Sequence, residues 1–374
     1  MSVMLLIFGL ILFVLLVVVH EFGHFLAARR NGVEVEEFGI GFPPRAWSRK
    51  LKSGLLFTLN WLPLGGFVKL KGEHDADTHH GSYGAAKLSA KVKIMLAGVG
   101  MNLLVAFILL TLLALAGMPR LIDGQFTVAK DTKVLENNVL VGYIEPSSPA
   151  EKAGLQIRDR IVKLSNDRFS YDISAAEQLP KATQAYEGQS VKVEIVRSGV
   201  TQELTTKLRT TKEVEASKKT TDPKGYLGIS PTELTLRRST WSAPIVAGGL
   251  ILQFAKLTLV GLGSAVSGLV HGHASQASAQ VSGPVGVFVL LKDGSLLGYQ
   301  FVLMIIAIIS LTLAIMNTLP IPALDGGRLF VTLIYRAIKR PLSEATEDRI
   351  HGTGFALLMV LFVLITIVDV RRFW

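Results

Sequence analysis

Uncharged runs of apolar residues recur along the chain at lengths that match a lipid bilayer. Residues 4–19, 94–117, 301–319 and 352–368 carry no charged side chain. A helix needs about 20 mainly apolar residues to cross the hydrocarbon core of a membrane. The pattern therefore predicts a polytopic α-helical membrane protein with about four transmembrane helices.

A different pattern fills the stretch between the second and third of these runs. Residues 120–235 are polar and mixed in charge, and they contain short apolar runs such as VLVGYIEP, RIVKLSND and SVKVEIVRS. Such runs, separated by turn residues, are typical of β-strands. We therefore expect one inserted, soluble α+β domain outside the membrane.

These boundaries divide the chain into eight parts. We expect transmembrane helices at residues 1–30, 94–118, 299–334 and 352–374. Between them we expect a cytoplasmic-side loop with a membrane-associated β-hairpin at 31–93, the soluble domain at 119–235, a membrane-associated linker at 236–298 and a cytoplasmic loop at 335–351.

The first apolar run has a second interpretation, as a secretory signal peptide. No basic segment precedes it, however, and its apolar stretch is long for the core of a signal peptide. We therefore expect a helix that is retained in the mature protein.

Composition and charge narrow the function. The chain carries 39 Lys and Arg against 29 Asp and Glu, which gives a formal net charge of +10. The basic residues lie mostly in loops between apolar runs, where anionic lipid explains them better than nucleic acid does. Arg29 and Arg30 close the first run and predict that its C-terminal end lies in the cytoplasm. The chain has no cysteine, so disulfides, thiolate ligands and thiol nucleophiles are excluded.

The sequence HEFGH at residues 20–24 ends the first apolar run. Residues four apart share one face of a helix, so His20 and His24 can bind one metal ion. Glu21 lies beside them and can act as general base on a metal-bound water, as in the H-E-x-x-H zinc motif. The alternative is a polar helix end at the membrane interface. We favour the metal site, because ionisable groups are costly within a membrane.

Asp325 is our candidate for a third ligand, because a catalytic zinc takes three protein ligands and keeps one position open. It follows the third apolar run, in NTLPIPALDGGRL at residues 317–329. If that run leads inward, its end brings Asp325 to the same depth as the two histidines. Pro320 and Pro322 would stop the helix there. The alternative is that Asp-Gly-Gly forms a plain turn.

This geometry constrains the apolar stretch at residues 244–269. If it crossed the membrane fully, Asp325 would lie on the wrong side, so we expect it to lie along the membrane or to dip in and return. One observation opposes this topology. It places Arg371 and Arg372 outside, against the statistical preference for basic residues in the cytoplasm.

Three motifs together resemble the bacterial site-2 proteases, and more closely the regulator-of-sigma-E protease type, which carries PDZ domains. They are HEFGH, SGPVG at residues 282–286 and NTLPIPALDGG at residues 317–327. The resemblance implies one Zn²⁺ per chain, held by His20, His24 and Asp325, with Glu21 as base. It also implies a multi-pass protein of the bacterial inner membrane whose active site lies near the cytoplasmic side.

The same resemblance implies a reaction and its substrates. The reaction is hydrolysis of peptide bonds within or next to transmembrane segments of single-pass membrane proteins, such as anti-sigma factors or signal-peptide remnants. It usually follows a first cut by another protease. The partners implied are these substrates and the lipid bilayer, and no nucleic acid.

Further residues follow from the resemblance as substrate contacts. Asn317 would bind the substrate backbone near the scissile bond, although it could equally cap an unwinding helix. Residues 54–72 form a predicted hairpin that includes Asn60, Gly65 and Gly66. In the family such a hairpin approaches the active site, where a substrate strand could pair with its edge. The alternative is a hairpin lying on the membrane surface.

Two departures and one packing prediction accompany the resemblance. Val99 stands where the family usually has proline, and Arg328 where it often has histidine, which puts any supporting role at that position in doubt. For Asn102 we favour packing between helices: Gly98 and Gly100 allow their close approach, and Asn102 forms a hydrogen bond across to the neighbouring helix.

The segment at residues 142–169 resembles the PDZ domains of bacterial proteases, except that Arg158 stands where glycine is commoner. The loop GYLGI would then capture a carboxylate through its backbone N–H groups; its residues are Gly225, Tyr226, Leu227, Gly228 and Ile229. Two functions fit this domain: recognition of a C-terminus left by a first cut, and a steric gate against intact substrates. We rank the gate slightly higher.

Two other functional classes compete with a protease. A catalytically inactive, membrane-tethered PDZ scaffold would be expected to lose Glu21 or a ligand, and none is lost. A transporter would be expected to carry several acidic residues within its spans, and only Glu21 and Asp325 fit. The remaining histidines predict no site; we interpret His79, His80, His271 and His273 as solvated loop residues and assign nothing to His74 and His351.

Overall fold

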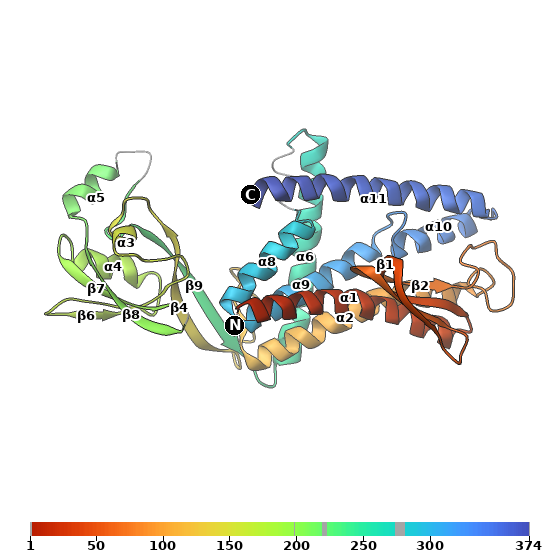
Figure 1. The fold of residues 1–374 in the computed structure, drawn as a ribbon, viewed down its shortest axis with the longest axis horizontal. Helices are drawn as coiled ribbons and strands as arrows, with labels where there is room; N and C mark the ends of the chain where they lie inside the picture. Colours follow the sequence, from red (N-terminus) through yellow and green to blue (C-terminus); the bar gives the residue numbers. More distant parts are fainter. Residues whose placement is uncertain (1, 198, 219–222, 274–280, 374) are drawn as a thin grey trace. The chain divides into compact units, whose positions relative to one another are not determined.

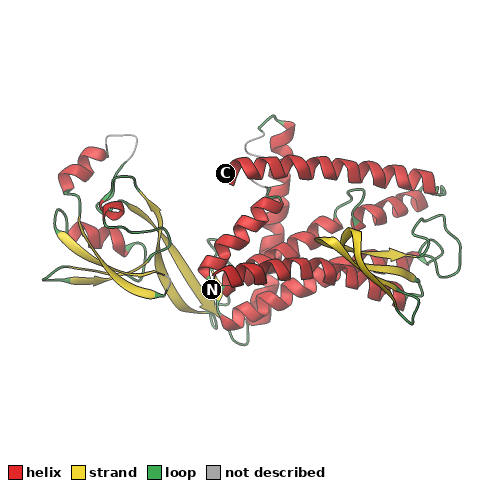
Figure 2. Cartoon of the chain, viewed as in Figure 1, coloured by secondary structure: helices red, strands yellow, loops and turns green. Residues whose placement is uncertain are grey.

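The structure is a computed structural model of the chain, and it describes residues 2–197, 199–218, 223–273 and 281–373. The chain forms two compact units. The first contains residues 1–116, 125–128 and 240–374, and the second contains residues 117–124 and 129–239. Helices dominate the first unit and strands the second (Figure 2).

Five helices of the first unit are long and apolar enough to cross a membrane. They are α1 (Ser2–Arg30), α2 (Leu88–Ala116), α6 (Ala243–Val270), α9 (Tyr299–Thr318) and α11 (Glu344–Phe373). The shorter helices α8 (Pro284–Leu297) and α10 (Asp325–Ala337) complete the helical part that the structure describes. A polytopic membrane protein with an inserted β unit is thereby confirmed.

Several element boundaries differ from our predictions. Helix α2 begins at Leu88 and α11 at Glu344, each six to eight residues earlier than its uncharged run. Polar residues extend both helices beyond the apolar segment that hydropathy detects. The expected helix at 299–334 is two helices, α9 and α10, separated at residues 319–324 by the segment that contains Pro320 and Pro322. The expected linker at 236–298 holds α6 and α8.

Helix α6 is a fifth candidate span, in addition to the four that we predicted. It is one continuous helix over the ambiguous stretch 244–269. Figure 1 shows it running across the direction of α1, α2 and α9 rather than alongside them. Our expectation that this segment lies along the membrane, or dips in and returns, stays a prediction.

Helices α1 and α2 lie in direct contact near the HEFGH motif. A Cβ atom at Gly23 would lie 2.6 Å from the backbone oxygen of Ala97, so only glycine allows this approach. A buried cluster follows on the C-terminal side of Gly23; it contains Tyr83 together with Ala28, Val33, Leu70, Ile94 and Met95. The cluster joins both helices to the strands that follow α1, and it thereby fixes the C-terminal end of α1.

Two long strands after α1 form a hairpin in the loop at 31–93, but it is not the one that we predicted. They are β1 (Val35–Lys50) and β2 (Leu56–Leu70). Residues 54–72, which we expected to form both strands of the hairpin, contain the single strand β2, and its partner β1 precedes it in the chain. Both strands bend back on themselves, because Phe38 pairs with Phe57 on one side and with Val68 on the other. The result is one small ladder of four neighbouring segments, in which residues 66–70 form one edge.

The second unit is built on an antiparallel sheet with the strand order β3-β9-β4-β5-β7-β8, and β6 pairs with β5. Its strands are β3 (Met118–Pro119), β4 (Lys133–Ile144), β5 (Arg160–Ser165), β6 (Ser170–Asp172), β7 (Ser190–Arg197), β8 (Val200–Lys207) and β9 (Ile229–Arg238). Three short helices accompany them: α3 (Pro149–Lys152), α4 (Gln178–Ala185) and α5 (Thr211–Ser217). Alternating apolar residues of β4, β5 and β7 fill the core.

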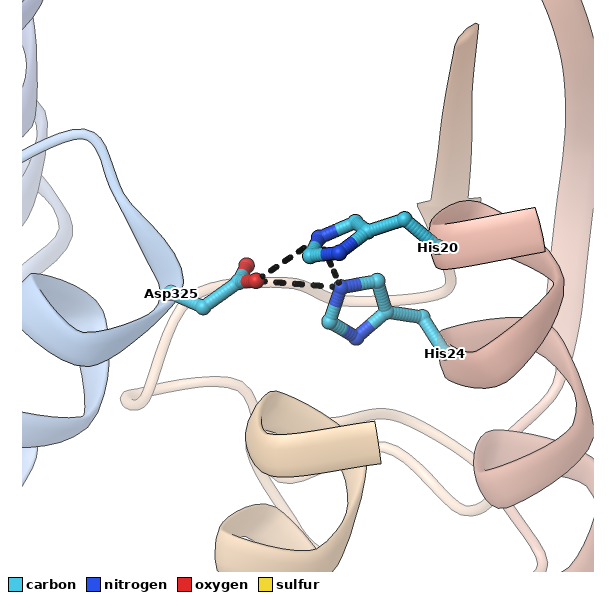
Figure 3. A group of neighbouring side chains, drawn as sticks. All are labelled: His20, His24 and Asp325. Atoms are coloured by element: carbon cyan, nitrogen blue, oxygen red, sulfur yellow. Dashed lines mark hydrogen bonds and ion pairs between the residues drawn. The ribbon is translucent and has the colours of Figure 1, made fainter. Parts of the chain in front are cut away.

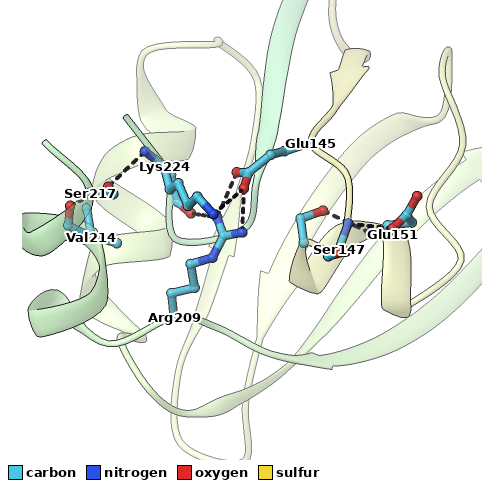
Figure 4. Close-up of polar contacts among 9 residues, drawn as sticks. Glu145, Ser147, Glu151, Arg209, Val214, Ser217 and Lys224 are labelled. Atoms are coloured by element: carbon cyan, nitrogen blue, oxygen red, sulfur yellow. Dashed lines mark hydrogen bonds and ion pairs between the residues drawn. The ribbon is translucent and has the colours of Figure 1, made fainter. Parts of the chain in front are cut away.

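The predicted ligand loop at residues 225–229 leads into β9, and hydrogen bonds to its carbonyl oxygens hold it in place. Arg209 donates to both carboxylate oxygens of Glu145, at 2.8 and 2.7 Å, and to the backbone oxygen of Gly225 at 2.8 Å (Figure 4). The backbone oxygens of Leu227 and Gly228 also accept hydrogen bonds. These contacts use the carbonyl groups of the loop, and carboxylate capture by its N–H groups stays a prediction.

Arg158 shows why glycine is commoner at its position. Its φ is 75°, in the left-handed region that residues with a Cβ atom rarely adopt. The next residue, Asp159, is buried and accepts two hydrogen bonds from Arg197, at 2.8 and 2.6 Å. The hydrogen bonds that Arg197 donates to Asp159 raise the pKa of its guanidinium above the ordinary value.

Arg197→Met is expected to destabilise the second unit by about 2 kcal/mol, because it leaves the Asp159 carboxylate buried without its counter-charge. Hydrogen exchange of β5 and β7 in the full-length protein measures this as amide exchange faster by roughly thirtyfold. Lys192→Met is the control on the same strand, since Lys192 pairs with Glu203 on the exposed surface. Equal exchange in the two variants would contradict the argument.

Candidate metal centre

Three side chains from opposite ends of the chain converge in the first unit (Figure 3). Nε2 of His20 and Nε2 of His24 lie 3.0 and 3.2 Å from Oδ2 of Asp325. The two Nε2 atoms lie 3.2 Å from each other. Both histidines are buried, at 7% and 6% exposure, and the Asp325 side chain is 22% exposed. Two histidines and one carboxylate therefore aim their donor atoms at one point.

The secondary structure explains this convergence. One turn of α1 brings His20 and His24 to the same face. Asp325 is the first residue of α10, directly after the break at residues 319–324. Gly326 and Gly327 let α10 begin close to this break, because a Cβ at either position would clash with the backbone oxygens of Thr318 and Ile321. The aspartate thus reaches the histidines from a newly started helix.

The second ring nitrogen of each histidine has its own partner. Nδ1 of His24 donates to the backbone oxygen of Ile94 at 2.7 Å, which leaves Nε2 as the acceptor atom. Nδ1 of His20 lies 3.2 Å from the side-chain amide of Asn102, which is fully buried. The contacting atom is Nδ2, whereas Oδ1 is buried with no hydrogen-bond partner among the described residues. Exchanging the two amide atoms, which have nearly the same shape, gives Oδ1 the Nδ1–H as a donor and likewise leaves Nε2 for a metal. Both contacts come from α2.

The donor set fits zinc. Histidine nitrogens and a carboxylate oxygen are zinc ligands, and zinc binds each at roughly 2.0–2.2 Å in tetrahedral geometry. Such a tetrahedron has edges of about 3.3 Å between ligand atoms. The observed separations of 3.0, 3.2 and 3.2 Å are close to that spacing. Among the described residues, His20, His24 and Asp325 form the group of possible metal ligands whose donor atoms all lie within 4.8 Å of one another.

Glu21 lies next to this cluster and meets the hairpin. Its carboxylate interacts with the backbone N–H of Val68 in β2. A Cβ atom at Gly66 would lie 3.4 Å from Cγ of Glu21, so the strand passes directly beside it. The edge segment 66–70 therefore borders the predicted general base.

The other predicted substrate residues fall in different surroundings. Asn60 is buried, and its amide donates to the backbone oxygen of Gly41 at 3.1 Å, which holds the bend of β1. Gly65 is buried beside Phe42, and its φ of 125° requires glycine. Asn317 lies partly buried in the last turn of α9. Of these four residues, Gly66 is the one that contacts Glu21, and substrate binding stays a prediction for all of them.

Two neighbours of the site were not assigned to it by the sequence. Asn102, which we expected to serve packing, contacts His20. The predicted contact of Asn102 with a neighbouring helix is confirmed, but the sequence did not show that its partner is a histidine of the metal site. The backbone oxygen of Ile94 carries no sequence signal at all. Both show that α2 orients the histidines.

Arg328 lies one turn after Asp325 and forms an ion pair with Glu73 at 3.2 Å. Burial opposes its charged form, but Glu73 holds the pKa of the guanidinium above its usual value. Arg328 therefore attaches α10 to the loop between β2 and α2, a structural role at the position where we noted a departure from the family pattern.

Comparisons with known proteins agree with this geometry. The family model described as Peptidase family M50 matches residues 8–361. A provisionally named zinc metalloprotease of Clostridium acetobutylicum is 29% identical over 99% of this chain and 98% of its own length. The protease RseP of Yersinia pestis is 26% identical over 96% of each chain. The zinc metalloprotease RasP of Geobacillus kaustophilus is 25% identical over 98% of this chain and 97% of its own length.

Proposed function

The chain belongs to peptidase family M50 and is a zinc metalloendopeptidase of the multi-pass membrane type, and from this premise we propose that it cuts substrates within or next to their transmembrane segments. The observation that carries the proposal is the position of the metal cluster. Its two histidines lie on α1, a helix of 29 residues apolar enough to span a bilayer. A peptide bond must therefore come to this depth to meet them.

The residues have separate roles in the reaction. His20, His24 and Asp325 would hold one zinc ion, which supplies the Lewis acidity that makes water acidic enough to lose a proton near neutral pH. Glu21 takes the proton of the attacking water and delivers it to the leaving amine. Asn102 and the backbone oxygen of Ile94 fix the ring orientations of the histidines. Asn317 would bind the peptide carbonyl near the scissile bond.

The hairpin explains how a helical substrate would be presented. A peptide bond inside a helix is shielded by the helix's own hydrogen bonds, so the substrate must unwind before it is cut. Edge segment 66–70 of β2 lies beside Glu21, as described above. An extended substrate pairing with this edge would place its backbone next to the base without demanding a particular sequence.

We place the reaction as the second cut of regulated intramembrane proteolysis in the bacterial inner membrane. The second unit would be a PDZ-like domain outside the membrane, and the metal site would lie near the cytoplasmic side. We rank a steric gate above C-terminus recognition for this unit. An inactive scaffold is set aside, because the chain is a metalloendopeptidase with its ligand set complete.

A reconstituted reaction tests the proposed function. The full-length protein in liposomes is expected to cut a single-pass substrate whose outer domain is already removed, at a bond that mass spectrometry locates within or beside the apolar segment. A zinc chelator should abolish this cleavage and added zinc should restore it. Cleavage that persists without metal, or that falls only in soluble parts of the substrate, would refute the proposal.

A further inference from the structure

The segment that delivers Asp325 to the site is short and strained. Residues 319–324 join α9 to α10, and Ala323 lies two residues before the aspartate. Its φ is 77°, a left-handed conformation that is uncommon for a residue with a Cβ atom. Such a conformation persists only where surrounding contacts hold it.

Local hydrogen bonds hold only part of the segment. The N–H groups of Ile321 and Leu324 donate to the backbone oxygens of Leu319 and Ile321, at 2.8 and 3.1 Å. Both bonds lie within the segment, so they shape it without attaching it to the rest of the unit. The strained residue Ala323 uses a more distant partner.

That partner is His351, in the second turn of α11. The backbone N–H of Ala323 donates to its Nδ1 at 3.2 Å, across 28 positions of sequence. Gly354, one turn further along the same face of α11, packs on the neighbouring Pro322, and a Cβ there would lie 2.5 Å from Cβ of the proline. The last long helix thus contacts two adjacent residues of the segment.

This hydrogen bond defines the state of the imidazole. A ring nitrogen that accepts a hydrogen bond carries no proton, so the proton of the neutral ring lies on Nε2. Nε2 is buried, and it has no hydrogen-bond partner among the described residues. The ring is therefore committed to the Ala323 contact through one atom, Nδ1.

We propose that His351 is a positioning residue for the third metal ligand: through Nδ1 it holds the strained backbone at Ala323 and thereby sets where α10 begins and where the Asp325 carboxylate lies. The inference rests on the proposed function, since it concerns the same metal site. Sequence reasoning assigned nothing to this histidine, because its partner is a backbone N–H that no sequence pattern marks.

Two polar substitutions separate this role from general packing. In asparagine, Oδ1 occupies nearly the position of Nδ1, whereas in glutamine Oε1 occupies nearly the position of Nε2. His351→Asn should therefore keep the hydrogen bond from Ala323, and His351→Gln and His351→Leu should lose it. The readout is the zinc dissociation constant of the purified full-length protein, measured by competition with a chelator, independently of proteolysis.

We expect His351→Asn to bind zinc like the unaltered protein, and the Gln and Leu variants to bind it about tenfold more weakly, the lower end of effects for residues that support a metal ligand. His74→Leu is the control. It removes a contact of 2.9 Å to Asp348 in the same turn of α11 without touching residues 319–324, and should leave zinc affinity unchanged.

Equal zinc affinity in all three His351 variants, or an Asn variant as weak as the Leu variant, would overturn the inference. Weakening by His74→Leu to the same extent would also overturn it, because docking of α11 in general would then explain the effect. If the unaltered protein bound no zinc, the proposed function itself would fail. Zinc binding without a response to His351 would leave that function standing.

Discussion

Glu21→Gln is expected to lower the rate of cleavage of a membrane-embedded substrate by about a thousandfold, within the range by which positioned acid–base groups accelerate reactions. Glutamine has nearly the same shape as glutamate but cannot take a proton from water. Glu21 is not among the three residues whose donor atoms converge on the metal site. The variant should therefore fold and bind zinc with unaltered affinity while it loses activity.

Two measurements on the same preparation check this expectation. Cleavage of a single-pass substrate in liposomes gives the rate, and chelator competition gives the zinc affinity. Glu203→Gln is the matched control, because Glu203 lies on β8 of the second unit in an exposed ion pair with Lys192, and the same change there should leave both quantities unaffected. Near-normal cleavage by the Glu21 variant would show that another group is the base.

The main parts of the metal centre could be predicted from sequence for physical reasons. Two histidines four residues apart share a helix face wherever the helix lies, so their pairing needed no tertiary information. Asp325 followed from the bilayer, which restricts where the ends of apolar helices lie. The first inference uses only the geometry of one helix, and the second uses only the depth of helix ends in the membrane.

Contacts between distant segments could not be predicted in the same way. The oxygen of Ile94 lies 70 positions from His24, and the N–H of Val68 is a backbone group, so neither leaves a trace in residue type. Asn102 and His351 are visible in the sequence, but their roles depend on which helix packs where. Hydropathy likewise missed the polar ends of α2 and α11, because it detects apolar segments rather than helices.

The approach of α2 to the histidines carries the second large prediction. Gly98 faces both ligands, and a Cβ atom there would lie 2.6 Å from Nε2 of His20 and closer still to Nε2 of His24. Neither imidazole can yield freely, because Asn102 and the Ile94 oxygen hold their opposite nitrogens. Gly98→Ala should therefore displace the ligand atoms, at a cost of about 3 kcal/mol, which is roughly a hundredfold loss of zinc affinity.

Gly100→Ala provides the control for this substitution, two residues along the same helix. Gly100 is exposed, and nothing lies within 4 Å of the Cβ that alanine would add, so our prediction that it allows close helix packing is wrong. The same gain in helix propensity therefore comes without a clash. Zinc affinity and substrate cleavage should fall together in the Gly98 variant and stay unchanged in the Gly100 variant. If Gly98→Ala bound zinc normally, α2 would not hold the histidines in place, and the support that we assign to Asn102 and Ile94 would lose its basis.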